Sequence, residues 1–436
     1  MLKILLTVGF VLAGAALSYA ADAPPPQKVL NTGDTAWMLV STALVMLMTP
    51  GLGLFYGGMV RRKNVLGTII QSFIILCMVS VIWVLWGYTL AFGPDKGGLI
   101  GGLEWFGLNG VGQEPSDYAT TIPHLLFMMY QGMFAAITPA LITGAFAERM
   151  KFSALLMFSA LWLTFVYAPL CHWVWGGGWI GGALGALDFA GGTVVHINSA
   201  VAALAAILFI GKRKGYGKVA MPPHNVTMTI MGAALLWFGW FGFNAGSALT
   251  SGGLASIAFV TTNTATGAAA MAWTFVEWYH RGKPTALGVV SGAVAGLVAI
   301  TPAAGYVGPV ASIIIGGAAG VICYIAVSFR PKHGLDDSLD VLGIHGVGGT
   351  LGALLTGVFA STVINPAGKN GLLHGNPGLL MKQLIAVVAS YVFVFVVSAI
   401  ILKIVDMVIG LRLSEEDESM GLDLAVHGEN GYDFEH

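Results

Sequence analysis

The sequence predicts an all-α membrane protein with eleven transmembrane helices, arranged as two inverted five-helix repeats plus a peripheral eleventh helix. Three observations lead there: an apolar composition, eleven long apolar runs, and basic residues after every second run. Hydrophobic residues make up 56% of the 436 residues, charged residues only 9%, and the mean hydropathy is +0.80. Soluble domains have about a quarter of their residues charged, so we expect lipid to cover most of this surface.

The apolar runs are about 20 residues long, which is enough to cross the hydrocarbon core as a helix. Polar residues or Gly/Pro breaks separate them. Glycine is abundant, with 61 residues, and recurs inside the runs, which favours close helix–helix packing. The predicted spans are 36–59, 65–92, 121–147, 152–174, 191–211, 225–250, 254–279, 285–303, 309–329, 343–363 and 380–411.

Basic residues follow every odd-numbered span up to the ninth. The alternate loops carry few basic residues, Lys96 and Lys369 among them, and several acids. By the positive-inside rule the basic loops face the cytoplasm, which places the N-terminus outside and the C-terminal tail inside. The residues that set this orientation are Arg61, Arg62, Lys63, Arg149, Lys151, Lys212, Arg213, Lys214, Lys218, Arg281, Lys283, Arg330 and Lys332.

The N-terminus has the pattern of a secretory signal peptide. One lysine precedes an apolar run, and Ser18-Tyr19-Ala20 forms a small-residue cleavage site before Ala21. An additional transmembrane helix is the alternative, but a Pro-rich tract follows and no basic cluster does. We therefore expect a signal peptide over 1–20, a periplasmic segment over 21–35, and a bacterial inner (plasma) membrane location.

Two histidines occupy matching positions in the two predicted halves. His196 lies near the start of the fifth span and His345 near the start of the tenth. At about 1.5 Å per residue, His196 lies roughly 12 Å inward from Asp188, and His345 roughly 8 Å from Asp340. Because the two spans enter the membrane from opposite faces, the two imidazoles are expected to meet near the midplane. Such a buried pair indicates a pore. The alternative is that each histidine only makes a structural hydrogen bond to a neighbouring helix.

Asp188 itself allows two interpretations. An acid at the membrane threshold favours a cation, and an acid before a helix caps its first N–H groups. Three nearby tryptophans, Trp173, Trp175 and Trp179, are typical of an interfacial belt.

The remaining motifs argue against an enzyme. Cys77, Cys171 and Cys323 are far apart and are interpreted as small core residues rather than metal or redox ligands. We expect no metal and no cofactor, because the sequence has no metalloprotease, nucleophile-elbow or phosphate-loop motif. Paired histidines holding haem is an open alternative. The net charge of -1 gives no field for nucleic acid.

Five stretches together resemble the ammonium transporter family of Amt, Mep and Rhesus proteins, and the bacterial Amt branch most. They lie on the predicted spans in order, over almost the whole mature chain. The stretches are PGLGLFYGGMVRRKNVL, DFAGGTVVHINSAVAAL, WFGFNAGS, GIHGVGG and GLRLSEEDESMGLD. The resemblance implies the ammonium transporter fold over 36–411, a homotrimer with one pore per subunit, and a cytoplasmic regulatory tail over 412–436.

The resemblance also implies roles for individual residues. Phe134, Trp175 and Ser247 resemble the outer recruitment site, and Phe134 and Phe243 the stacked rings that close the pore. His196 and His345 resemble the family's histidine pair, and Asp188 its entrance acid. Tyr130 stands where many relatives have Phe, which places a hydroxyl near the vestibule.

The implied function is transport: ammonium is recruited and deprotonated, and ammonia crosses with the proton relayed separately. A passive channel for ammonia or carbon dioxide and an ammonium sensor are the alternatives. Whether methylammonium is also carried is left open. The acidic tail resembles a segment that docks under the subunits near the binding site of a PII-type signal protein, although its composition alone favours a disordered end.

Overall fold

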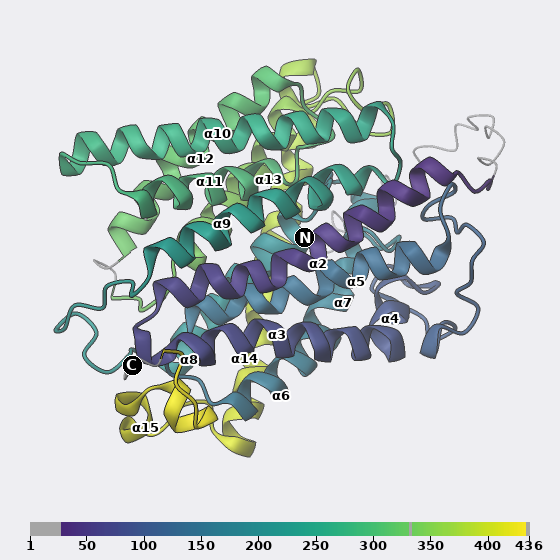
Figure 1. The fold of residues 1–436 in the computed structure, drawn as a ribbon. Helices are drawn as coiled ribbons and strands as arrows, with labels where there is room; N and C mark the ends of the chain where they lie inside the picture. The colour runs from purple at the N-terminus through teal and green to yellow at the C-terminus, as the bar shows by residue number, and fades with distance from the viewer. Residues whose placement is uncertain (1–27, 331–333, 433–436) are drawn as a thin grey trace, which may run out of the picture.

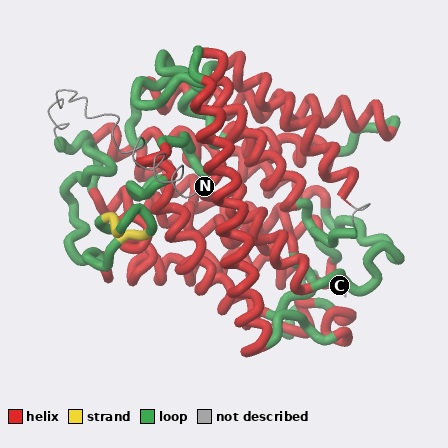
Figure 2. Tube along the Cα trace, turned by 180° about the vertical axis from the view of Figure 1, so that it is seen from behind, coloured by secondary structure: helices red, strands yellow, loops and turns green. Residues whose placement is uncertain are grey.

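A computed structural model describes residues 28–330 and 334–432. The expected signal peptide and part of the segment 21–35 lie outside the described residues. Long helices run side by side along one direction (Figure 1), with most loops gathered at the two ends of this bundle (Figure 2). This arrangement satisfies the backbone hydrogen bonds inside each helix, as a membrane requires.

The first half contains five membrane-length helical units, three of which are continuous through a wide π turn. A two-residue hairpin of β1 (Asp95–Lys96) and β2 (Ile100–Gly101) lies in the second loop. The units are α2 (Thr32–Met59); α3 (Val65–Ile82) with η2 (Trp83–Gly87) and α4 (Tyr88–Phe92); α5 (His124–Ile142); α6 (Phe152–Trp162) with η5 (Leu163–Tyr167) and α7 (Ala168–Val174); and η7 (Gly192–Ile197) with α8 (Asn198–Ile210).

The second half repeats this plan, and α14 is left over, as expected for a peripheral last helix. The units are α9 (Val226–Trp240) with η8 (Phe241–Ala245); α10 (Gly253–Arg281); α11 (Ala286–Ile300); α12 (Pro309–Phe329); η11 (Leu342–Gly346) with α13 (Val347–Phe359); and α14 (Pro377–Ile409), followed by α15 (Glu415–Met420) and η13 (Asp423–His427). Short helical turns are η1 (Arg62–Asn64), η3 (Phe106–Leu108), η4 (Thr143–Ala145), η6 (Ile180–Leu184), η9 (Gly246–Ala248) and η12 (Leu372–His374).

The helices match the predicted spans in order. Within the described residues, nine helical units are long and apolar enough to cross a membrane. The other two predicted spans, near 254–279 and 285–303, correspond to α10 with 29 residues and to α11 with only 15. The structure is therefore compatible with eleven spans, of which the eighth is shorter than the sequence predicts.

Small residues let the helices approach closely, as the glycine content predicts. A Cβ atom added at Gly316 of α12 would lie 2.1 Å from the backbone oxygen of Ala265 on α10. One helical turn on, a Cβ at Gly320 would lie 2.3 Å from the backbone oxygen of Ala269. Larger side chains there would push the two helices apart.

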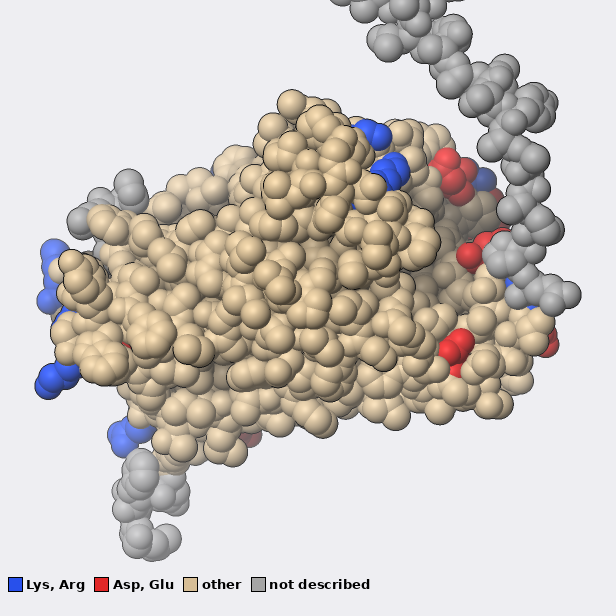
Figure 3. Space-filling model, turned by 90° about the horizontal axis from the view of Figure 1, so that it is seen from above, with Lys and Arg blue, Asp and Glu red and all other residues tan. Residues whose placement is uncertain are grey.

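On the face seen in Figure 3, charge lies toward the two ends of the bundle. Most Lys and Arg are at the left end, Asp and Glu lie mainly toward the right together with a few basic side chains, and an uncharged belt separates the two groups. We call the end at which α2 and α10 finish the basic end, and the end that carries the β1–β2 hairpin the opposite end. The uncharged belt is the surface that a bilayer would cover.

Candidate functional site

The two histidines meet inside the bundle. His196 lies on η7 and His345 on η11, and both side chains are buried. Their Nδ1 atoms are 3.2 Å apart. Since a neutral imidazole has one donor and one acceptor nitrogen, one Nδ1 must donate to the other. Each ring is placed by a π turn at the start of its helix, so the two halves use the same local structure.

A polar group not singled out from the sequence supports His196. Thr301 Oγ1 lies 3.4 Å from His196 Nε2 and accepts a 2.9 Å hydrogen bond from Trp240 Nε1. The same hydroxyl donates to the backbone oxygen of Leu297. Thr301 follows α11, so its link to η7 depends on tertiary packing.

The space beside the histidine pair is narrow and apolar. A cavity of about 10 Å³ is bounded by both histidines, Phe243, Trp240 and aliphatic side chains. Such a volume holds about one molecule of the size of water. It suits a small neutral solute better than a hydrated ion.

A column of aromatic rings leads from the histidines toward the opposite end. The ring of Phe243 on η8 stacks on His196 at 6.1 Å, and its centroid is 4.2 Å from that of Phe134 on α5. Trp175, at the end of α7, lies edge-on to Phe134 at 5.8 Å and 90°. The two phenylalanine rings therefore lie between Trp175 and His196.

A hollow of about 350 Å³ lies on the far side of the phenylalanine pair; we call it the vestibule. Trp175, Phe134, Ser247 and Asp188 are all in its wall, so the structure brings the predicted recruitment residues together. The full lining is Phe92, Tyr118, Phe127, Gln131, Phe134, Val174, Trp175, Asp188, Phe189, Ser247, Leu249, Leu254, Tyr306, Asn365 and Ala367.

Tyr130 lies behind this lining. Its hydroxyl is 2.9 Å from the backbone oxygens of both Gly242 and Phe243, and 3.2 Å from Ser247 Oγ. The Gly242 oxygen also accepts the backbone N–H of Gly246, and the Phe243 oxygen also accepts the Ser247 hydroxyl, so the tyrosine hydroxyl is an additional donor at the π turn η8. The hydroxyl expected near the vestibule thus acts on the backbone and on Ser247.

Asp188 caps the helix that carries His196. Its Oδ1 accepts the N–H groups of Gly191 and Gly192, at 2.8 and 2.7 Å, and its Oδ2 those of Thr193 and Val194, at 2.7 and 3.2 Å. Both carboxylate oxygens are thereby engaged. The geometry supports the capping interpretation directly, and the carboxyl group also lies in the vestibule wall.

The counterpart of Asp188 in the second half is Asp337 rather than Asp340, the acid from which the expected depth of His345 is counted. Asp337 Oδ2 accepts the N–H of Leu342 at 2.8 Å, at the start of η11, whereas the Asp340 carboxylate pairs with Arg330. Burial raises the pKa of Asp337 to about 7. The signal was available in the sequence, because each capping aspartate precedes its histidine by eight residues.

The other two tryptophans are held by the loop at the opposite end. Trp173 Nε1 donates to the backbone oxygen of Leu99, and the Trp179 backbone N–H donates to that of Gly98. Their rings contact each other at 5.6 Å. Trp175 differs, because its Nε1 donates to the backbone oxygen of Asp188 and its ring faces the vestibule.

The cysteines are not a cluster. Cys171 and Cys323 are buried, as expected of core residues, but Cys77 is exposed on α3, so its assignment to the core is wrong. Within 28–330 and 334–432, no group of three or more His, Cys, Asp or Glu residues is placed to hold a metal ion.

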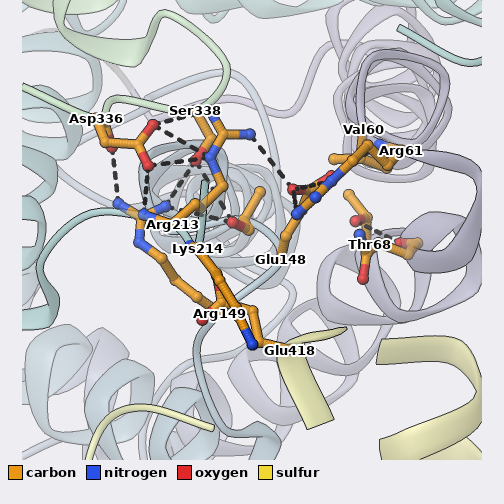
Figure 4. A network of polar contacts seen from close by, with 12 residues as sticks. Val60, Arg61, Thr68, Glu148, Arg149, Arg213, Lys214, Asp336, Ser338 and Glu418 are labelled. Carbon is orange, nitrogen blue, oxygen red and sulfur yellow. Dashed lines mark hydrogen bonds and ion pairs between the residues drawn. The ribbon is translucent and has the colours of Figure 1, made fainter. Parts of the chain in front are cut away.

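At the basic end, a buried ionic network joins four loops (Figure 4). Glu148 lies between Arg61, at 2.6 Å, and Arg213, at 3.4 Å, and Arg213 also pairs with Asp336 at 2.8 Å. These loops follow the first, third, fifth and ninth spans, so the prediction that they share one side is confirmed. The pairings between them could not be inferred from the sequence, which shows only scattered loop charges.

The network controls the ionisation of its acids. Burial disfavours the Glu148 carboxylate, but hydrogen bonding and positive charge from Arg61 and Arg213 outweigh it, so the pKa of Glu148 lies below its ordinary value. The pKa of Asp336 is lowered in the same way, by Arg213 and Arg149 against burial. Both acids therefore stabilise the fold as anions.

Glu148→Gln is expected to destabilise the protein by about 3–5 kcal/mol, because two arginines lose a buried charge partner. Thermal unfolding in detergent measures the change. Glu415→Gln, at an exposed acid 3.6 Å from Lys214, is the control and should change little. Since the folded pKa of Glu148 is depressed, its contribution is present above its unfolded pKa and lost as pH falls through the folded one; equal stability losses at pH 7 and pH 3 would contradict this.

The described part of the tail, 412–432, is docked on the basic end. Glu418 accepts the Lys214 backbone N–H at 2.6 Å, and Asp423 accepts that of Gly67 at 2.8 Å. Arg412 binds the second carboxylate oxygen of Glu418 at 2.7 Å. A disordered, solvated end does not describe these residues.

Comparisons with known proteins agree with this geometry. The sequence profile described as Ammonium Transporter Family matches residues 36–432. The chain is 58% identical to the ammonium transporter of Bacillus subtilis (strain 168), over 92% of this chain and 99% of that one. It is 52% identical to ammonium transporter Amt1 of Archaeoglobus fulgidus, over 92% and 100%.

Solved structures show the same fold. The crystal structure of Saccharomyces cerevisiae Mep2 superposes with a TM-score of 0.86 at 35% identity, covering 93% of this chain and 92% of that chain. A structure described as a sensor Amt protein superposes with a TM-score of 0.84 at 28% identity, covering 90% and 98%.

Proposed function

The chain belongs to the ammonium transporter family, and we propose that it carries ammonium from the periplasm to the cytoplasm by separating it into ammonia and a proton. The observation that supports this most is the unbroken sequence of vestibule, phenylalanine pair and histidine pair. Trp175, Phe134 and Ser247 form the recruitment site, and Phe134 and Phe243 the gate. His196 and His345 line the pore.

Selection starts in the vestibule. Ammonium has the charge and size of a potassium ion, so charge alone does not distinguish them. Aromatic faces attract a cation by about 0.5–2 kcal/mol each, and the Ser247 oxygen recognises a directional N–H group. Asp188 adds a fixed negative charge in the same wall.

Deprotonation lowers the cost of crossing. An intact cation in the small apolar cavity beside the histidines would cost several kcal/mol or more, roughly the effective desolvation penalty of one buried ion. Neutral ammonia hydrogen-bonds to imidazole and fits the cavity. The proton follows through the bonded Nδ1 atoms of His196 and His345.

The proposed location, orientation and partners are supported by the family membership and by the distribution of basic residues between the loops. We infer a multi-pass protein of the bacterial inner membrane, with the basic end cytoplasmic and the mature N-terminus periplasmic after cleavage of residues 1–20. A homotrimer and a PII-type partner at the docked tail complete the proposal. It includes no enzymatic step and no cofactor.

Currents on solid-supported membranes test this function. Proteoliposomes should give a current with ammonium and none with potassium; methylammonium shows whether the substrate range extends further. Ammonia flux without current would favour the passive neutral-gas channel. The likeness to the sensor Amt protein keeps a sensing role as second candidate, which ammonium binding without flux would support.

Trp175→Leu is expected to raise the half-saturating ammonium concentration severalfold, because the loss of one cation–π face costs about 0.5–2 kcal/mol. Trp179→Leu is the matched control, since that ring packs on Trp173 instead. Current titrations measure both. Equal effects of the two substitutions would show that Trp175 is a residue of the interfacial belt and has no specific role in ammonium binding.

Deletion of the chain after Arg412 is expected to reduce flux or its regulation, because it removes Glu418 from the Lys214 loop and Asp423 from the first turn of α3. Uptake and PII binding are measured together. Glu416→Gln, at an exposed acid of the same segment, is the control. Unchanged flux together with unchanged PII binding would show that the tail has no part in transport or in its regulation.

A further inference from the structure

Gln131 faces the vestibule and has no role in the function described above. It lies on α5 three residues before Phe134, so the two side chains share one face of the helix. Both line the vestibule together with Trp175 and Ser247. Only 9% of Gln131 is exposed, and its Oε1 has no hydrogen-bond partner among the described residues.

An unsatisfied buried amide oxygen is costly, about 1–3 kcal/mol, and native structures rarely leave one without a reason. Two of the neighbouring polar groups are already engaged. Asp188 accepts four backbone N–H groups, and Ser247 Oγ donates its proton to the backbone oxygen of Phe243 at 2.8 Å. Among the polar groups beside Phe134 and Trp175, the Gln131 amide oxygen and a lone pair of Ser247 are open to a ligand.

We propose that Gln131 is a second hydrogen-bond acceptor for ammonium in the vestibule, acting beside Ser247. This inference rests on the proposed function and deepens it. Ammonium carries four directional N–H groups, of which two can bind these oxygens while aromatic faces cover the rest. A bare cation of similar size needs a fuller shell of oxygens to replace its water, so the same wall serves it poorly.

The test separates substrate binding from turnover. Gln131→Leu should raise the half-saturating ammonium concentration about tenfold, the loss of one charge-assisted hydrogen bond, and should change the maximal current less than about twofold, since a group that binds substrate before the gate affects affinity first. Gln131→Glu keeps an oxygen acceptor and should hold the half-saturating concentration at or below that of the wild type. Leu254→Ala, which alters the same hollow without removing a polar atom, is the control.

Two outcomes would overturn the assignment: an unchanged half-saturating concentration in Gln131→Leu, or an equal rise in Gln131→Leu and Gln131→Glu. Size-exclusion chromatography checks that the variants fold, and Gln131→Met replaces Gln131→Leu if leucine is not tolerated. A wild-type protein without any ammonium current would instead defeat the proposed function. The two failures are therefore distinguishable.

Discussion

Asp188→Ala is expected to abolish transport almost completely and to lower the yield of folded protein. Four backbone N–H groups, of Gly191 and the first three residues of η7, lose their acceptor, and each buried unsatisfied group costs about 1–3 kcal/mol. Because η7 carries His196, the histidine pair loses its placement. The vestibule also loses its fixed negative charge.

Asp188→Asn separates the two roles. An amide retains one oxygen acceptor, so this variant should keep more folded protein than alanine does while carrying no charge. Current and size-exclusion profiles are measured for both. Asp117→Ala, at an exposed acid paired with Lys28, is the control. Full current in Asp188→Asn would show that capping alone explains this residue.

Replacement of either pore histidine with aspartate is expected to admit intact cations, potassium included. The carboxylate places a negative charge in the narrow cavity, where it favours a cation over neutral ammonia. Potassium-driven current should appear in His196→Asp and His345→Asp and be absent from the wild type. His280→Asp, at an exposed histidine at the end of α10, is the control; potassium exclusion in both pore variants would contradict a pore at the histidines.

Much of the fold could be predicted because lipid imposes simple rules on a chain. The length of the apolar runs predicts the membrane spans, and the Lys and Arg residues predict which loops lie on the same side of the membrane. The spacing of His196 and His345 within their spans predicted that the two meet, since inverted halves bring equivalent positions together. The exception, α11, is an Ala- and Gly-rich segment whose helical part ends at Ile300.

The rest depends on contacts between residues far apart in the sequence. Tyr130, from another helix, donates a hydrogen bond to the wide turn η8, and Glu148 pairs with Arg61 and Arg213 from two other loops. The composition of the acidic tail predicts disorder. The tail is ordered because its carboxylates accept hydrogen bonds from the backbone N–H groups of Lys214 and Gly67, which only the folded protein brings near. Hydropathy patterns do not contain these pairings.

The central claim is that ammonia and the proton take separate steps past the histidine pair. Alanine at position 196 or 345 removes a link of the hydrogen-bonded pair and leaves an apolar space through which neutral ammonia still fits. The most direct measurement is current against ammonium uptake in proteoliposomes for His196→Ala and His345→Ala. The account predicts that the current falls far more than uptake does in both variants, whereas wild-type currents with unaltered selectivity in both would contradict it.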